Sequence, residues 1–124
     1  MKPVRFSILA LAALPLAACG GEKQAGPADA VAICATCHTF NKGGMKRTGP
    51  NLHGIVGATA GSQPGFTYSG AMKDSGITWT PETLDAFIAA PGKLIPGNRM
   101  GFAGEPDAAK RKAIIAWLRD ESTK

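Results

Sequence analysis

The chain has 124 residues, of which 44% are hydrophobic and 19% charged, and it contains 16 Gly, 9 Pro and 3 Cys. This length fits one small domain with a thin core, and the glycine and proline content predicts that much of the chain is loop. The formal net charge of +5 falls to +3 without Lys2 and Arg5 of the N-terminal segment, so the composition gives no support to nucleic-acid binding.

The N-terminus carries the pattern of a secretory signal. Lys2 and Arg5 precede an apolar run over residues 6–16, which is shorter than a membrane-spanning helix. The run leads into the sequence Leu-Ala-Ala-Cys that ends at Cys19, and this resembles the bacterial lipobox, in which the cysteine becomes the acylated first residue of the mature protein. The alternative is an ordinary cleaved signal that leaves Cys19 as a free thiol, a liability in an oxidising compartment. We therefore favour lipidation at Cys19.

These features predict three segments. Residues 1–18 form a lipoprotein-type signal peptide, residues 19–25 form a lipidated cysteine with a flexible tether, and residues 26–124 form the folded domain.

The hydrophobic spacing of the domain predicts an all-α fold with three main helices, short helical turns and long loops. The first helix begins at Gly26-Pro27, because proline suits the first helical position, and it continues through Val31 and Ile33. Residues 39–78 lack helical periodicity and are rich in Gly, Asn, Pro and Thr. Such a long loop needs something to wrap around.

Two further helices are predicted downstream. One starts with Thr80 as N-cap and Pro81 at the next position, and Pro91 ends it. The other starts near Pro106 and carries basic side chains that we interpret as a solvated face. Apolar residues recur at helical spacing in both: Leu84, Phe87 and Ile88 in the first, and Ile114, Trp117 and Leu118 in the second.

The first predicted helix leads into the sequence Cys34-Ala35-Thr36-Cys37-His38. Two cysteines separated by two residues and followed directly by histidine are typical of a covalent c-type haem site. On one turn of helix the two thiols reach the two vinyl groups of one porphyrin, and the next residue brings an imidazole beneath the ring to bind iron. A porphyrin would also supply the apolar centre that a chain this short lacks.

Three other interpretations of this motif are weaker. A structural disulfide between Cys34 and Cys37 is compatible with an oxidising compartment. A thioredoxin-like redox pair requires a βαβ context, and no alternating strand pattern flanks the motif. A zinc site requires four ligands, but His53 is the only other histidine and no second cysteine pair completes the set.

The chain resembles class I, mitochondrial-type cytochromes c across residues 26–118. The matching stretches beyond the haem motif are Thr48-Gly-Pro-Asn-Leu-His-Gly54, Gly65-Phe-Thr-Tyr-Ser69, Gly76-Ile-Thr-Trp79, Ile95-Pro-Gly-Asn-Arg-Met100 and Phe102-Ala-Gly104. The haem motif together with a Pro-Gly-x-x-Met stretch some sixty residues downstream is highly specific.

The resemblance implies roles for particular residues. His38 and Met100 would be the axial iron ligands, and the soft thioether of Met100 favours Fe(II) and raises the reduction potential. The Pro50 carbonyl would accept a hydrogen bond from the other ring nitrogen of His38. Tyr68 and Trp79 would donate to a buried haem propionate. Of the other methionines, Met45 is too close in sequence to His38 to reach the far side of the ring easily, and Met72 is interpreted as core packing.

The chain also departs from the family pattern. Ala58 stands where the family often has an arginine near a propionate, and Leu94 replaces a tyrosine. Ala30 replaces an aromatic residue of the first helix and is expected to face Trp117, so that a large side chain compensates for a small one. These changes affect the propionate environment and the potential rather than the fold. His53 matches a peripheral family histidine and receives no catalytic role.

These residues predict a non-enzymatic, single-electron carrier with one covalent haem c, exported and lipid-anchored on the periplasmic side of a bacterial membrane. Its partners would be membrane redox complexes, such as a cytochrome c reductase and a terminal oxidase, and the protein would be a monomer. The alternatives are a haem enzyme or a gas or peroxide sensor with a labile methionine, and a dedicated redox subunit of one oxidase or dehydrogenase.

The surface expected to meet these partners is less basic than in freely diffusing relatives. Ile33, Gly92 and the Pro106-Asp107 pair stand at positions that are often basic, whereas Arg47, Lys93 and Arg99 remain. One interpretation is drift on a solvated surface. The other is that a tether at Cys19 replaces long-range electrostatic steering.

Overall fold

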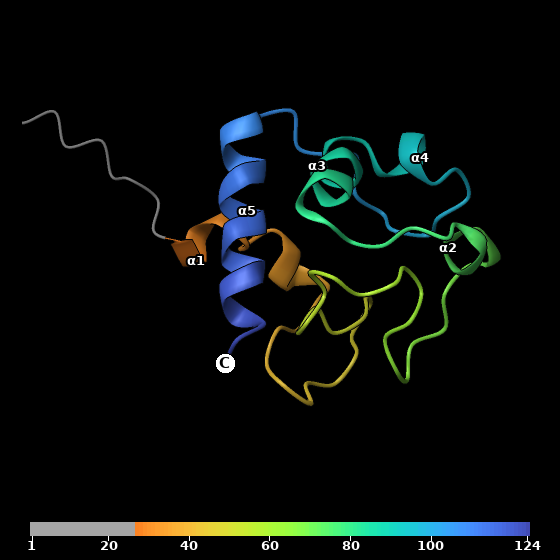
Figure 1. Cartoon of the computed structure of the whole chain (residues 1–124), viewed down its shortest axis with the longest axis horizontal. Helices are drawn as coiled ribbons and strands as arrows, with labels where there is room; N and C mark the ends of the chain where they lie inside the picture. Colours follow the sequence, from red (N-terminus) through yellow and green to blue (C-terminus); the bar gives the residue numbers. More distant parts are fainter. Residues whose placement is uncertain (1–26) are drawn as a thin grey trace, which may run out of the picture.

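The computed structural model describes residues 27–124, so the predicted signal peptide, Cys19 and the tether lie outside the described residues. Its elements, in chain order, are α1 (Pro27–Ala30), the 3-10 turn η1 (Cys34–Thr36), α2 (Gly70–Asp74), α3 (Pro81–Ala89), α4 (Pro91–Leu94) and α5 (Ala108–Glu121) (Figure 1). Within this range no β-strand occurs, and a single antiparallel bridge joins Thr59 to Thr78. The predicted all-α class is confirmed.

The prediction of one continuous first helix is wrong. α1 ends at Ala30, and the chain passes through a turn into η1. Where α1 ends, the Ala32 N–H donates to the Asp29 carbonyl at 3.3 Å, and further on the amide N–H and side-chain hydroxyl of Thr36 both donate to the Ile33 carbonyl, at 3.4 and 2.7 Å. These i to i+3 bonds tighten the backbone into a 3-10 turn. His38 N–H then donates to the Cys34 carbonyl at 2.9 Å, so the motif occupies one compact turn.

The predicted second helix is confirmed at its start. The Thr80 hydroxyl accepts from the Thr83 N–H at 3.2 Å, and the Thr83 hydroxyl accepts from the Thr80 N–H at 2.8 Å, so the two residues form a reciprocal cap before Pro81. At the other end, α3 ends at Ala89, just before Pro91 as predicted, but Pro91 also starts a new helix. Ala90 lies between two helices, and Pro91 is the first residue of α4.

α5 begins two residues after Pro106. The Asp107 carboxylate accepts from the N–H groups of Ala109 and Lys110, at 2.8 and 3.3 Å, and so caps the helix. α5 packs against both α1 and α3, and α3 packs against α4 (Figure 1). We call α1, α3 and α5 the helical frame. Its buried side chains from the two longer helices are Leu84, Phe87, Ile88, Ile114, Ile115 and Leu118.

A polar clamp ties the two longer helices together. Arg111 of α5 donates to the Asp85 carboxylate of α3 through Nε at 2.8 Å. The same guanidinium donates through Nη1 to the carbonyls of Glu105 and Pro106, each at 2.9 Å. One residue of the predicted solvated face therefore fixes the start of α5 against α3.

Residues 37–69 form a different kind of structure, which we call the loop face. It contains no helix (Figure 1). Its buried hydrophobic residues are only Ile55 and Ala60. Backbone bonds hold it together: Gly49 N–H donates to the Cys37 carbonyl and Leu52 N–H to the Thr39 carbonyl, both at 2.8 Å. The prediction that residues 39–78 are entirely loop is wrong in one place, because α2 lies within them with Ser69 as its N-cap.

The aromatic packing beneath α5 also differs in detail from expectation. Trp117 lies edge-on to Phe40, with ring centroids 4.8 Å apart. Phe40 therefore supplies an aromatic neighbour from the loop face, and Ala30 is partly buried against the same core. This contact joins the loop face to the helical frame.

Candidate functional site

A cavity of about 610 Å³ lies between the loop face and the helical frame. Its volume falls in the range of about 300–1,000 Å³ that is usual for sites of cofactors and small molecules. The structure brings seven of the predicted site residues to its wall: Cys34, Cys37, His38, Pro50, Tyr68, Trp79 and Met100. Much of the remaining wall is apolar and comes from Leu52, Ile55, Leu84, Phe87, Ile114 and Leu118.

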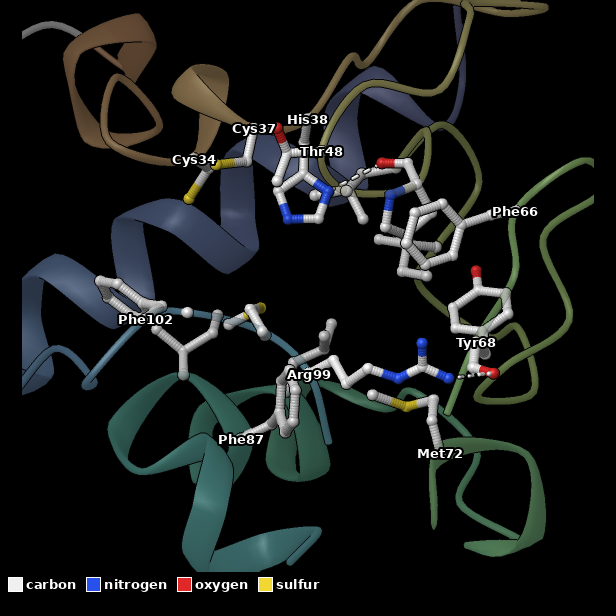
Figure 2. Close-up of a pocket in the computed structure, with 18 of the residues that line it drawn as sticks. Cys34, Cys37, His38, Thr48, Phe66, Tyr68, Met72, Phe87, Arg99 and Phe102 are labelled. Carbon is white, nitrogen blue, oxygen red and sulfur yellow. Dashed lines mark hydrogen bonds between the residues drawn. The ribbon is translucent and has the colours of Figure 1, made fainter. Parts of the chain in front are cut away.

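The two thiols and the imidazole enter the cavity from one end (Figure 2). Cys34 and Cys37 are free thiols, so the structure has no disulfide between them. Burial raises the pKa of the Cys34 thiol, with a smaller opposing effect from a backbone hydrogen bond. The η1 turn therefore presents two neighbouring thiols at the edge of a cavity.

His38 is held in one orientation. Its Nδ1 lies 2.7 Å from the Pro50 carbonyl oxygen, which can only accept, so Nδ1 carries the proton. Nε2 is left with its lone pair free, and the ring projects into the cavity (Figure 2). Burial lowers the pKa of His38, although the bond to Pro50 acts in the opposite direction. Burial therefore favours a neutral imidazole, and the bond to Pro50 leaves the other ring nitrogen available as a ligand.

Gly49 allows the loop to lie against this imidazole. A Cβ at this position would overlap the His38 ring, with Nδ1 only 2.7 Å away. Gly49 lies in the Thr48–Gly54 stretch, but no role was predicted for it. Its signal was the proline that follows it, since the carbonyl of Pro50 can reach His38 only if the preceding residue has no side chain.

Two methionines lie in the cavity wall, Met72 and Met100. Met100 is fixed by Asn98, whose side chain accepts from the Met100 N–H at 2.9 Å and donates to the Ile95 carbonyl at 2.8 Å. Met72 belongs to α2, and the Ser69 hydroxyl accepts from its N–H at 3.1 Å. Met45, in contrast, is 82% exposed and does not line the cavity.

Tyr68 and Trp79 line another part of the wall. The Tyr68 ring packs edge-on against Phe66 with centroids 4.8 Å apart, and burial raises its pKa. Trp79 is 4% exposed, and its backbone bonds to Ala58 and Gly57 fix its position. His53 does not line this cavity; the Gln63 side chain donates to its carbonyl at 2.9 Å.

The residues present fit a covalently attached haem. The cavity is large and apolar, two thiols and one unprotonated imidazole nitrogen enter it, and a thioether lies in the same wall. Gly49 provides the space that a closely packed imidazole needs.

Comparison with known proteins agrees with this chemistry. The chain is 50% identical over 86 residues to cytochrome c2 of Rhodopila globiformis, covering 69% of this chain and 80% of that protein. It is 51% identical over 90 residues to a cytochrome c homolog of Bradyrhizobium diazoefficiens, covering 72% of this chain and about half of that relative (49%). Cytochrome cH from Methylobacterium extorquens has a similar structure, with a TM-score of 0.71 and 41% identity over 76% of this chain and 94% of that chain. No protein-family model matches the chain.

The chain therefore belongs to the class I cytochrome c family. It is an electron carrier with a covalently bound haem c and not an enzyme, and it exchanges electrons with redox partner proteins.

Proposed function

We propose that this protein carries single electrons between membrane redox complexes on the periplasmic side of a bacterial membrane, to which a lipid on Cys19 anchors it. Cys34 and Cys37 would hold the haem through thioether bonds, and His38 and Met100 would bind its iron. The supporting observation is that His38, with its free nitrogen, and the Asn98-fixed Met100 line one cavity.

The haem supplies the redox change, which is the gain or loss of one electron at iron. The protein supplies fixed ligands and a dry surrounding. Pro50 orients His38, and Asn98 fixes the backbone that carries Met100. The apolar walls exclude water, so little solvent has to reorganise when the charge changes. With both His38 and Met100 bound, the iron would have no site left for a substrate.

Replacement of Met100 tests this assignment. Met100→Ala should lower the reduction potential by on the order of 0.1 V or more, since axial ligands set potentials over about 0.8 V. It should also remove the weak absorption band of the oxidised protein that reports methionine ligation, and admit carbon monoxide. Met45→Ala is the matched control, because Met45 is exposed and outside the cavity. An unchanged potential and spectrum in Met100→Ala would assign the sixth ligand to another group.

The lipid anchor is tested at Cys19. Cys19→Ser should release the protein from membranes or block its processing, because acyl chains contribute about 0.8 kcal/mol per buried CH₂. Within residues 27–124 no helix combines the length and hydropathy that crossing a bilayer requires. Incorporation of labelled palmitate into wild type but not into Cys19→Ser is the matched measurement. A correctly cleaved Ser variant that stays on membranes at high salt would refute the anchor.

The tether also predicts how partners are met. Ile33, which lines the cavity, is 53% exposed and Met45 is 82% exposed, so the surface offers apolar contacts as well as charge. A short flexible tether holds the protein near its partner at an effective concentration of order millimolar. Electron transfer should therefore depend weakly on salt but slow sharply for the untethered form. Rates of both forms should be compared between low and physiological salt, where the Debye length falls from about 30 to about 8 Å. A steep salt dependence in both, with no cost of losing the tether, would contradict the proposal.

A further inference from the structure

Arg99 is the one permanently charged side chain among the residues that line the cavity. It is exposed as a residue, so it lies where the cavity opens, and its guanidinium donates to the Tyr68 carbonyl at 3.3 Å. Among residues 27–124 the ion pairs are Arg111–Asp85 and Lys124–Glu121, so no carboxylate of that range pairs with Arg99. A cation in a largely apolar wall is stabilised by an anionic partner.

The cavity has two distinct ends (Figure 2). Cys34 and Cys37 lie at one end and Tyr68 lies at the other, and the guanidinium of Arg99 points toward Tyr68. Haem also has two different ends, because its vinyl groups are on one half of the ring and its two propionates are on the opposite half. With the vinyl half bonded to the two thiols, the carboxylates face the end that holds Tyr68 and Arg99.

We propose that Arg99 is the cationic partner of a haem propionate and that its charge raises the reduction potential. The assignment rests on the haem site proposed above. Ala58, where the resemblance implies an arginine, brings no charge and does not line the cavity; its backbone bonds to Ile55 and Trp79. Arg99 lines the cavity from the segment that precedes Met100, so it supplies a positive charge from another part of the chain.

A fixed positive charge near iron disfavours the ferric state, which carries one more positive charge than the ferrous state. The guanidinium also cancels part of the propionate charge, which would otherwise stabilise ferric iron. Both effects favour the reduced protein. Removing the charge should shift the equilibrium toward the oxidised form by about tenfold, which is about 59 mV for a one-electron couple.

The test compares reduction potentials of the holoprotein in three variants. Arg99→Gln removes the charge and keeps a polar side chain, and Arg99→Lys keeps the charge. Lys93→Gln removes an exposed cation of α4 that does not line the cavity. We expect Arg99→Gln to shift the redox equilibrium about tenfold toward the oxidised form, which lowers the potential by about 59 mV. The potentials of Arg99→Lys and Lys93→Gln should stay near that of wild type.

The spectrum separates this effect from a disturbed ligand. An intact methionine band in Arg99→Gln together with a lowered potential supports the proposal. If that variant loses the band, Arg99→Lys decides: a potential near wild type supports the role of charge, and a potential as low as that of the Gln variant overturns it. An unchanged potential with slower electron transfer to partners would make Arg99 a docking residue and overturn the proposal. Failure of the haem site itself would appear separately, as wild-type protein without covalent haem.

Discussion

The helical frame and the loop face differ in what holds them together. In the frame, six buried apolar side chains are shared between α3 and α5, which pack directly against each other, and the Arg111–Asp85 clamp lies at its edge. The loop face buries only two hydrophobic side chains, Ile55 and Ala60, and depends on backbone bonds such as that from Gly49 to Cys37. Five of the six frame side chains, and Ile55 of the loop face, line the cavity. Both regions therefore need the cofactor to complete their packing, but the loop face has fewer apolar contacts of its own.

The largest effect is expected from removing both thiols. Cys34→Ala with Cys37→Ala should abolish covalent haem and leave little folded protein, because haem binding energy contributes directly to folding. Haem staining on denaturing gels and circular dichroism measure the two effects, and each single variant should show weaker attachment. Hydrogen exchange should show that residues 37–69 lose protection before α5. A stable, helical, haem-free double variant with a protected loop face would refute the comparison.

A large but local effect is expected at Gly49. In Gly49→Ala the new methyl group would overlap the His38 ring, and such overpacking costs typically about 1–3 kcal/mol. Guanidinium unfolding of the holoprotein measures the loss. The matched control is Gly92→Ala in α4, where a Cβ meets nothing within 4 Å and alanine should stabilise by about 0.5–1 kcal/mol. Equal stability of the two variants would show that the loop does not press on the imidazole.

A smaller effect is expected from opening the clamp of the frame. Arg111→Gln removes the charge that faces Asp85 and the bonds to Glu105 and Pro106. The denaturation midpoint should fall modestly, and exchange should rise in the first turn of α5 while the loop face keeps its protection. Lys112→Gln, one residue further and exposed, should leave both quantities unchanged. Loss of protection confined to residues 37–69 would contradict the assignment of the Arg111 clamp to the helical frame.

The smallest effect at neutral pH is expected at Tyr68, the only tyrosine in the chain. Burial raises its pKa, against an opposing hydrogen bond with the Gln63 backbone, so the folded protein holds the phenol proton more tightly than the unfolded chain does. This stability is present below the unfolded pKa of about 10 and is lost as pH rises through the folded value. Tyr68→Phe should therefore lose less stability than wild type in alkaline solution. Tyrosinate absorbance of wild type should titrate above about 10, and titration at or below that value would contradict the burial.

Sequence predicted the frame better than the loop face, for a physical reason. Local signals mark helices: Thr80 and Pro81 gave the start of α3, and Asp107 caps α5 close to the predicted Pro106. The break after α1 depends on individual backbone bonds, such as that from the Ala32 N–H to the Asp29 carbonyl, which hydrophobic periodicity does not predict. The roles of Gly49 and Phe40 depend on contacts across the cavity edge and with α5. The family resemblance indicated the seven cavity residues because the matching motifs surround one cofactor, but it could not show which way Arg99 points.

The segment that carries Met100, residues 90–105, begins and ends beside the last turn of α3. Ala90 follows α3 directly, and Glu105 N–H returns to the Ile88 carbonyl at 2.8 Å. Gly104 makes this return possible, because its φ of +121° suits glycine and a side chain there would strike the backbone of Ala89. Pro91 and Ile95 are buried and α4 packs against α3, so this part of the segment is tied to the fold. Residues 96–104 form a loop, and each doubling of loop length costs only about 0.6 kcal/mol in closure entropy. Substitutions in this loop, which carries Asn98, Arg99 and Met100, can therefore change redox properties while the helices that support it stay the same.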